Sequence, residues 1–249
     1  MSRHPKPPSR EASSPDSVAP ALETRDLTKD YGDVVALHPI SLRVQRSERI
    51  ALIGHNGSGK TTLLRIVAGL LDASGGSARV FGDPPGSIAS RRHVSYLADT
   101  PVFYEDLSVH EHLEYVARMH GAIGWEERAD DLLERLGILD RADDLPSRFS
   151  RGLRQKAAIA VAFIRPFDLL LVDEPFVGLD AAGKDALLAL FDDAAAAGAT
   201  LVVATHELSF VDRVPRIVAL RDGRLIHDGS STDASARRLV TAEGTSIEE

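Results

Sequence analysis

The residues with the clearest chemical potential in this chain form one short glycine-rich segment. It reads Gly54-His55-Asn56-Gly57-Ser58-Gly59-Lys60-Thr61-Thr62. Its glycines lack a Cβ, so the backbone can take positive φ and turn N–H groups inward around an anion. Lys60 can then reach the β- and γ-phosphates of a nucleotide, and the Thr61 hydroxyl can ligate Mg²⁺. The spacing predicts a loop that binds a nucleoside triphosphate; an ordinary glycine-rich turn is the alternative.

The residues on either side of this loop favour phosphate binding over the ordinary turn. The apolar run Ile50-Ala51-Leu52-Ile53 precedes the loop and predicts a strand. After the loop, apolar residues predict a helix from about Thr61 to Leu70. The first turn of such a helix adds unpaired N–H groups and the positive end of its dipole. A strand, a glycine-rich bend and a helix start are the three parts of a phosphate-binding loop.

A second apolar run, from Asp168 to Val172, ends in the adjacent carboxylates Asp173 and Glu174. A run without alternation is typical of a central parallel strand that is covered on both faces. Ligands of α/β sheets bind at the carboxyl ends of such strands. We therefore expect Asp173 to hold the Mg²⁺ shell and Glu174 to orient or activate an attacking water. The alternative is a strand that ends in an acidic turn.

A histidine follows a third apolar strand, predicted from Thr200 to Thr205. A single histidine at a strand end is usually structural or solvated. At a sheet edge that also carries Lys60 and Glu174, however, His206 can hydrogen-bond a γ-phosphate oxygen or the attacking water. We therefore include it among the candidate catalytic residues.

Two other positions are candidates for contact with nucleotide. Ser150 is a good N-cap for the alanine-rich helix that follows it, so an anion can bind at this helix start. A capped helix with solvated basic residues is the alternative. Tyr31 lies between two predicted strands, and a nucleotide base needs an aromatic face on which to stack. A half-buried packing role is the alternative for Tyr31.

The remaining patterns predict the elements that position these residues. Alternating apolar residues predict strands, whereas two segments have apolar residues at helical spacing. The predicted strands comprise residues 22–27, 34–44, 50–53, 77–81 and 93–97, and the two helical segments comprise residues 109–119 and 126–136. Residues from about 100 to 165 then form a helical subdomain inserted into an α/β core. Further along, we expect a helix from about Ala182 to Ala197 and a hairpin with an Asp222-Gly223 turn.

Length and composition limit the possible classes of protein. The 249 residues are 43% hydrophobic, which suits one α/β domain over residues 21–230. Residues 1–20 are rich in Pro and Ser and are predicted to be disordered, and residues 231–249 to be a peripheral tail. A net charge of −8 argues against a general nucleic-acid-binding surface. Cysteine is absent, and no apolar stretch approaches the roughly 18 residues of a membrane-spanning helix.

Together these motifs resemble those of the ATP-binding-cassette (ABC) ATPases, specifically the nucleotide-binding subunit of an ABC transporter. The resemblance covers about Ala21 to Asp228. The phosphate loop is similar to Walker A, the strand ending in Glu174 to Walker B, Gly178-Leu179-Asp180 to the D-loop, and His206 to the switch histidine. Tyr31 takes the place of the adenine-stacking aromatic. The resemblance implies a P-loop NTPase fold, an N-terminal antiparallel β lobe, ATP and Mg²⁺ as cofactors, and ATP hydrolysis.

Two sites depart from the family pattern. The family signature is Leu-Ser-Gly-Gly-Gln, and here it reads Phe149-Ser150-Arg151-Gly152-Leu153. The serine and the second glycine, which a phosphate contact needs, are kept, and this form resembles the signature of exporter-type subunits. The family usually has Gln after the strand at residues 93–97, where this chain has Asp99. We expect Asp99 to act in the metal site, with a shorter reach than glutamine and an added charge.

The resemblance also implies partners. Two subunits pack head to tail, so that Ser150, Gly152 and Asp180 would contact nucleotide bound to the other protomer. A homodimer is therefore expected, at the cytoplasmic, inner face of the cell membrane. Short helices of separate permease subunits would enter a groove near Asp99, and no nucleic acid is expected as a partner. The alternatives are a soluble ABC ATPase acting on nucleic acid or ribosomes, and a P-loop kinase or GTPase, although the chain lacks an Asn-Lys-x-Asp motif.

Overall fold

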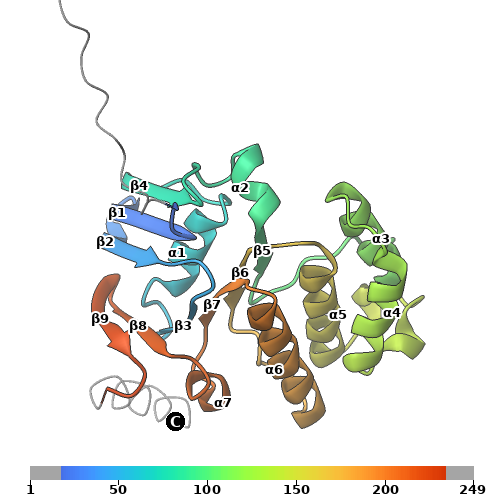
Figure 1. Cartoon of the computed structure of the whole chain (residues 1–249). Coiled ribbons are helices and arrows are strands. Elements are labelled where there is room, and N and C mark those ends of the chain that lie inside the picture. Colours follow the sequence, from blue (N-terminus) through green and yellow to red (C-terminus); the bar gives the residue numbers. More distant parts are fainter. Residues whose placement is uncertain (1–17, 234–249) are drawn as a thin grey trace, which may run out of the picture.

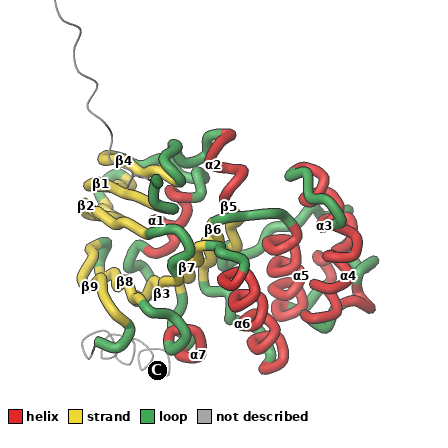
Figure 2. The backbone as a smooth tube through the Cα atoms, viewed as in Figure 1, coloured by secondary structure: helices red, strands yellow, loops and turns green. Residues whose placement is uncertain are grey.

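The computed structural model of the chain describes residues 18–233 (Figure 1). Most of the disordered segment predicted for residues 1–20 and of the peripheral tail predicted for residues 231–249 lies outside this range, namely residues 1–17 and 234–249. Within this range, the chain forms two sheets and a set of helices (Figure 2). In Figure 1 the helices α3, α4 and α5 lie together at one side of the molecule, and the smaller sheet lies at the opposite side.

The smaller sheet is antiparallel, with the strand order β2-β1-β4. Its strands are β1 (Leu22–Tyr31), β2 (Val34–Val44) and β4 (Gly75–Val80). This is the N-terminal β lobe that the sequence predicted. The strand β1 is longer than the predicted residues 22–27, because it continues through register shifts into the partly or fully exposed residues 28–31. These residues do not alternate in polarity, so the sequence carries no strand signal there.

The larger sheet has the strand order β5-β6-β7-β3-β8-β9 and is parallel except for β9. Its strands are β3 (Arg49–Ile53), β5 (Val94–Leu97), β6 (Leu169–Asp173), β7 (Thr200–Ala204), β8 (Arg216–Arg221) and β9 (Arg224–Ser230). All five residues of β6 are buried, which confirms the prediction of a central strand. Because β3, β6 and β7 are parallel, the chain segments that follow them emerge at the same edge of the sheet.

Two hydrophobic clusters cover the two faces of this sheet. On one face, α1 (Lys60–Val67) and the β lobe pack against Leu169 and Leu171 of β6. On the other face, Leu170 and Val172 pack with the remaining large helices. These helices are α3 (Val109–Met119), α4 (Trp125–Arg135), α5 (Arg151–Ile164) and α6 (Ala181–Ala196), and two short 3₁₀ turns, Leu139–Arg141 and Pro146–Arg148, lie between α4 and α5. The predicted α/β fold with its inserted helical subdomain is confirmed.

Two short helices were not predicted from the sequence, α2 (Ile88–His93) and α7 (Leu208–Val211). The large apolar residue of α2, Ile88, is 76% exposed, so there is no apolar face to detect. The available signal was Ser87, whose hydroxyl caps α2 by accepting from the Ser90 N–H. None of the helices within residues 18–233 combines the length and the apolar character that crossing a bilayer requires.

Candidate functional site

The glycine-rich segment forms a tight loop between β3 and α1. Its glycines Gly54, Gly57 and Gly59 have φ values of 153°, 84° and 102°, which side chains disfavour. Space is also limiting, because a Cβ at Gly54 would lie 2.3 Å from the Leu220 carbonyl oxygen. The helix α1 begins directly at Lys60. The loop therefore has the backbone that an inward-facing ring of N–H groups needs.

A cavity of about 320 Å³ lies against this loop. It is lined by the loop residues from His55 to Thr62, by Ala36 of β2 and by three acidic residues from elsewhere in the chain. These are Asp99, which follows β5, and Asp173 and Glu174 at the end of β6. The structure thus brings the predicted metal-binding and catalytic carboxylates to the phosphate loop.

At this cavity, Glu174 lies between two cationic or potentially cationic groups. Its Oε1 is 3.6 Å from the Lys60 ammonium, and its Oε2 is 3.2 Å from Nδ1 of His206. The Lys60 ammonium is nearly buried and also donates to the carbonyl groups of Gly54 and His55. Glu174 has a φ of 44°, and its N–H donates to the Ala204 carbonyl at the end of β7. A positive φ in a non-glycine residue is costly, and such residues cluster at functional sites.

Asp173 is the most deeply buried carboxylate of the site. Asp173 is 0% exposed, and neither of its carboxylate oxygens has a hydrogen-bond partner within the described residues. Burial raises the pKa of Asp173, while the Thr61 hydroxyl and the Lys60 ammonium act in the opposite direction. Carboxylate and hydroxyl oxygens are suitable Mg²⁺ ligands, so Asp173 and Thr61 fit this ion.

Within residues 18–233 no group of three or more Asp, Glu, His or Cys side chains could hold a metal ion unaided. This agrees with Mg²⁺ chemistry, because proteins commonly bind Mg²⁺ through one or two carboxylates together with substrate phosphates. Asp99 lines the cavity, and its Oδ1 accepts from the Thr100 N–H at 2.7 Å.

The turn between β8 and β9 contacts the phosphate loop, and the sequence did not predict this contact. The Gly223 N–H donates to the Ser58 carbonyl at 3.1 Å, and Asp222 Oδ1 lies 3.2 Å from Nε2 of His55. The Asp-Gly pair was the signal for the turn itself. Its contact with the loop joins residues far apart in the chain, so local sequence contained no indication of it.

The signature residues and Asp180 do not line this cavity. Ser150 caps α5, its hydroxyl accepting from the Leu153 N–H at 3.3 Å. Gly152 packs so closely on the loop after β6 that a Cβ there would lie 2.6 Å from the Gly178 carbonyl oxygen. Asp180 caps α6 by accepting a hydrogen bond from the Gly183 N–H, and it also accepts one from the Lys156 ammonium. These two hydrogen bonds lower the pKa of Asp180.

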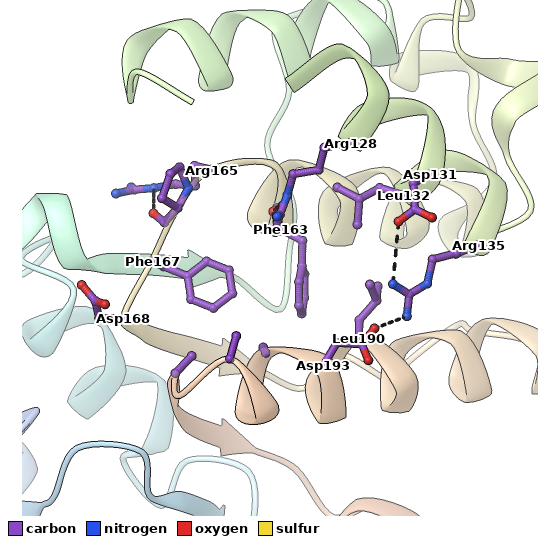
Figure 3. A pocket seen from close by; sticks show the side chains of 14 residues that line it. Arg128, Asp131, Leu132, Arg135, Phe163, Arg165, Phe167, Asp168, Leu190 and Asp193 are labelled. Carbon is purple, nitrogen blue, oxygen red and sulfur yellow. Dashed lines mark hydrogen bonds and ion pairs between the residues drawn. The ribbon is translucent and has the colours of Figure 1, made fainter. Parts of the chain in front are cut away.

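Tyr31 also lies apart from the cavity, at the end of β1. It is 51% exposed, and the Lys29 ammonium lies 5.0 Å from the centre of its ring. A separate cavity between α4, α5 and α6 contains none of the predicted site residues (Figure 3). There, Arg128 donates to the Phe163 carbonyl, and Arg135 pairs with Asp131 and Asp193.

Comparisons with known proteins identify the family of the chain. A family model described as ABC transporter matches residues 37–177. The chain is 33% identical over 210 residues to the SkfA peptide export ATP-binding protein SkfE of Bacillus subtilis (strain 168), covering 83% of this chain and 88% of SkfE. It is 36% identical over 227 residues to the aliphatic sulfonates import ATP-binding protein SsuB 1 of Paracoccus denitrificans (strain Pd 1222), covering 89% and 88%.

Solved structures show the same similarity. A structure of an ATP binding subunit of an ABC transporter superposes with a TM-score of 0.81 at 31% identity, covering 90% of this chain and 99% of that chain. The dimeric post-hydrolysis state of the ATP-binding cassette MJ0796 bound to ADP and Pi superposes with a TM-score of 0.78, covering 85% of this chain and 99% of that chain. Because the identity is 24%, this match supports the fold alone. These matches do not support a nucleic-acid-acting ATPase, a kinase or a GTPase. The chain belongs to the ABC transporter family, as one of its ATP-binding ATPase subunits.

Proposed function

We propose that this subunit hydrolyses Mg·ATP in the cavity beside the phosphate loop and uses Glu174 to activate the attacking water. The observation that carries the proposal is the position of Glu174 between Lys60 and His206. A carboxylate held by two such partners is aimed at the place where a γ-phosphate would meet water. Tyr31, half-exposed at the end of β1, would stack on the adenine.

Each residue has a separate role in this reaction. The water oxygen bonds to the γ-phosphorus while the bond from the γ-phosphorus to the β,γ-bridging oxygen breaks, and its electron pair leaves with ADP. Glu174 accepts a hydrogen bond from the water and takes its proton. The Lys60 ammonium exchanges the loop carbonyls for phosphate oxygens and offsets their charge. His206 donates to a γ-phosphate oxygen, which orients the group that is transferred.

The metal ion would be held by Asp173 and Thr61, with Asp99 as a further ligand. When bound, Mg²⁺ neutralises the charge of the phosphate oxygens. The two oxygens of Asp173, which have no partner within residues 18–233, support this assignment, because a buried carboxylate without partners is costly unless a ligand satisfies it.

The second half of the site would come from another copy of the chain. Ser150 and Gly152 lie at the start of a 14-residue helix whose first residues are exposed or half-buried, and they do not line the cavity of their own chain. A helix N-terminus binds anions through its free N–H groups. We therefore place Ser150, Gly152 and Asp180 against nucleotide bound by the partner in a homodimer.

Coupling to transport would use a groove of about 820 Å³ between the core and the helical subdomain. It is lined by residues of α1, β5, α3 and α5 and by the segment after Asp99, and its rim includes the exposed side chains of Val102 and Met119. Short helices of separate permease subunits would dock there, and the domain of residues 21–230 would be peripheral at the cytoplasmic, inner face of the membrane. The signature and the similarity to SkfE favour export, whereas SsuB 1 is named for import.

Trapping a dimer with ATP tests both the chemistry and the shared site. Glu174→Gln should lower steady-state turnover by at least ~10²-fold, since general-base catalysis contributes about that much. It should still bind ATP, and light scattering should then detect a dimer only when Mg·ATP is present. Unchanged turnover would remove Glu174 from the mechanism.

Two second-site variants test the contribution of Ser150. Aspartate and asparagine both cap helices well, so Ser150→Asp and Ser150→Asn keep the start of α5. In the Glu174→Gln background, Ser150→Asp should abolish the ATP-dependent dimer, because its charge repels the partner's γ-phosphate. Ser150→Asn, as the neutral control, should retain it. A dimer that forms equally well with Ser150→Asp would contradict the head-to-tail arrangement.

A further inference from the structure

Buried polar atoms without partners concentrate around the phosphate cavity. Within residues 18–233 five buried side-chain atoms lack a hydrogen-bond partner, and four of them belong to Ser58, Asp173 and Tyr96. Ser58 and Asp173 line the cavity. Tyr96 instead lines the groove of about 820 Å³, and its hydroxyl has no role in the proposed hydrolysis. Such an atom costs stability unless a ligand or water satisfies it.

The strand register places Tyr96 beside Asp173. In the parallel pair of β5 and β6, Tyr96 is opposite Leu171. Asp173 follows Leu171 by two residues, so its side chain leaves the sheet on the same face. With neighbouring strands about 4.8 Å apart and a rise of about 3.3 Å per residue, residues in this diagonal relation have Cα atoms roughly 8 Å apart, which is within reach of an aromatic side chain. Tyr96 packs into the cluster on the α1 face, and α1 supplies Thr61 to the cavity.

The Tyr96 hydroxyl is a hydrogen-bond donor at neutral pH. Burial raises its pKa to about 12, the carboxylates of Asp173 and Asp99 add to this effect, and the Arg65 guanidinium opposes it. Neither oxygen of Asp173 has a hydrogen-bond donor among residues 18–233. A donor and two acceptors, all buried and close to one another, are therefore chemically complementary. One water between them, or a small movement of either side chain, would satisfy both.

We propose that Tyr96 is a positioning residue of the metal site, whose hydroxyl donates to the Asp173 carboxylate, directly or through one water, when Mg²⁺ is bound. The inference rests on the proposed function of Asp173. Carboxylates that ligate metals are themselves held by hydrogen bonds, and loss of such a partner typically lowers metal affinity about 10–100-fold. Within residues 18–233 the hydroxyl has no hydrogen-bond partner, so the proposed role belongs to the metal-bound state.

The test is Tyr96→Phe, which removes one oxygen and keeps the ring. Calorimetric titration should use the Glu174→Gln background, so that nucleotide is not consumed, and should compare Mg·ATP with ATP in EDTA. We expect Tyr96→Phe to weaken Mg·ATP binding by about tenfold and to leave metal-free ATP binding within about twofold. Thermal unfolding without nucleotide should give a midpoint equal to or above that of the parent, because a buried unsatisfied hydroxyl is removed.

The matched control is Tyr115→Phe, the same change at a tyrosine of α3 that is 44% exposed. It should leave both affinities unchanged. Equal weakening of Mg·ATP and metal-free ATP by Tyr96→Phe, unchanged Mg·ATP affinity, or a lower unfolding midpoint without nucleotide would each overturn the role of Tyr96. A parent protein that binds neither form of ATP would instead overturn the proposed function, so the two failures are distinguishable.

Discussion

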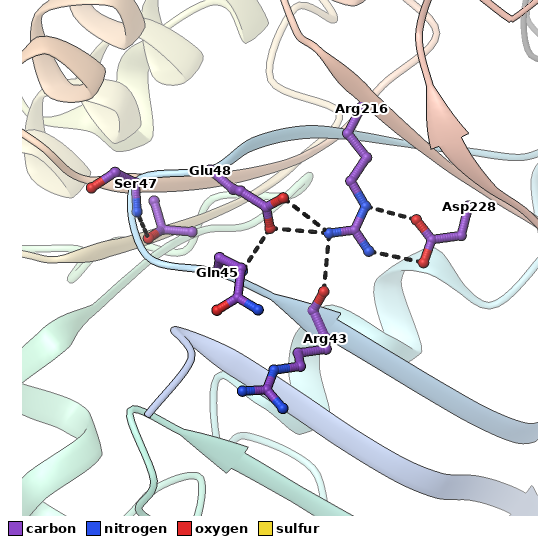
Figure 4. Close-up of polar contacts among 7 residues, drawn as sticks. Arg43, Gln45, Ser47, Glu48, Arg216 and Asp228 are labelled. Carbon is purple, nitrogen blue, oxygen red and sulfur yellow. Dashed lines mark hydrogen bonds and ion pairs between the residues drawn. The ribbon is translucent and has the colours of Figure 1, made fainter. Parts of the chain in front are cut away.

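The two ends of strand β3 carry polar clusters of opposite character. At its amino end, Arg216 binds both oxygens of Asp228 at 2.7 and 2.8 Å, Glu48 at 3.0 Å and the Arg43 carbonyl at 3.0 Å (Figure 4). These hydrogen bonds, chiefly those to Asp228, raise the pKa of Arg216. At the carboxyl end of the same strand lie the phosphate loop and Asp173, whose carboxylate has no partner within residues 18–233.

The difference separates a structural cluster from a functional one. The Arg216 cluster joins β2 of the lobe to β3, β8 and β9 of the central sheet, and its charges satisfy one another. At the carboxyl end, the buried Asp173 carboxylate has no hydrogen-bond partner within residues 18–233, so the fold bears a cost there that a bound ligand can relieve. Removing charges should therefore have opposite effects on stability at the two ends of β3.

The largest effect is expected from Asp173→Asn. Loss of a metal ligand should lower turnover by at least ~10²-fold, since a metal ion supplies several kcal/mol of charge stabilisation. Without nucleotide, the same variant should be more stable than the parent by about 1 kcal/mol, because a buried unpaired carboxylate is removed. Steady-state ATPase assays and thermal unfolding measure the two effects. A less stable variant would contradict the comparison.

The same variant has a predicted pH dependence. Because burial raises the pKa of Asp173, the folded protein holds this proton more tightly than the unfolded chain does. Its contribution therefore destabilises the fold as pH rises from its ordinary pKa through the raised folded value. The stability difference between Asp173→Asn and the parent should grow across that window, as measured by denaturant unfolding at several pH values. A difference that shrinks with rising pH would contradict this assignment.

Arg216→Ala should act in the opposite way. It leaves the carboxylates of Glu48 and Asp228 close together without their cation, and we expect a loss of about 2–3 kcal/mol, somewhat below the cost of breaking a fully buried pair. Both carboxylates are about 30% exposed, which is the reason for the discount. Denaturant unfolding measures the loss, and turnover at 25 °C should stay within about twofold (~0.4 kcal/mol). Arg216→Lys cannot bind Asp228 through a planar fork, so its free energy of unfolding should lie between those of the parent and Arg216→Ala.

Asp99→Gln tests whether Asp99 takes the role of the glutamine that the family usually has at this position. Glutamine reaches one methylene further and removes a charge near Asp173 and Glu174, so turnover should equal or exceed that of the parent. The bond from the Thr100 N–H to Asp99 is lost, which should cost at most about 1 kcal/mol. ATPase assays decide, and complete loss of activity would show that the Asp99 carboxylate has a role of its own.

The smallest effect is expected at the contact between His55 and Asp222. Their side chains are 41% and 78% exposed, so Asp222→Asn should change stability by less than about 0.5 kcal/mol. Asparagine tolerates the φ of 48° at this position, so the turn is kept. Thermal unfolding checks the value. A loss comparable to that of Arg216→Ala would show that nearness to the phosphate loop, rather than burial, decides the strength of an ion pair here.

Much of the site was predictable because it depends on residues adjacent in the chain. The loop glycines have the positive φ expected for an inward-turned backbone, and Ser150 caps the helix expected after it. Asp222 and Gly223 both have positive φ, as the Asp-Gly hairpin required. Strand β6 was recognisable from an apolar run that only a strand covered on both faces needs. Each of these features follows from local backbone preference or from the period of burial.

Contacts between distant segments were decided only by the tertiary structure. The strand order β6-β7-β3 is what brings Glu174, Lys60 and His206 to one edge, although these residues come from three separate parts of the chain. The register of β5 on β6 puts Tyr96 opposite Leu171 and on the same face as Asp173, and a shift by one residue would move it to the other face. Local patterns specify which residues form a strand, but the order and register of strands depend on how the whole hydrophobic core is buried.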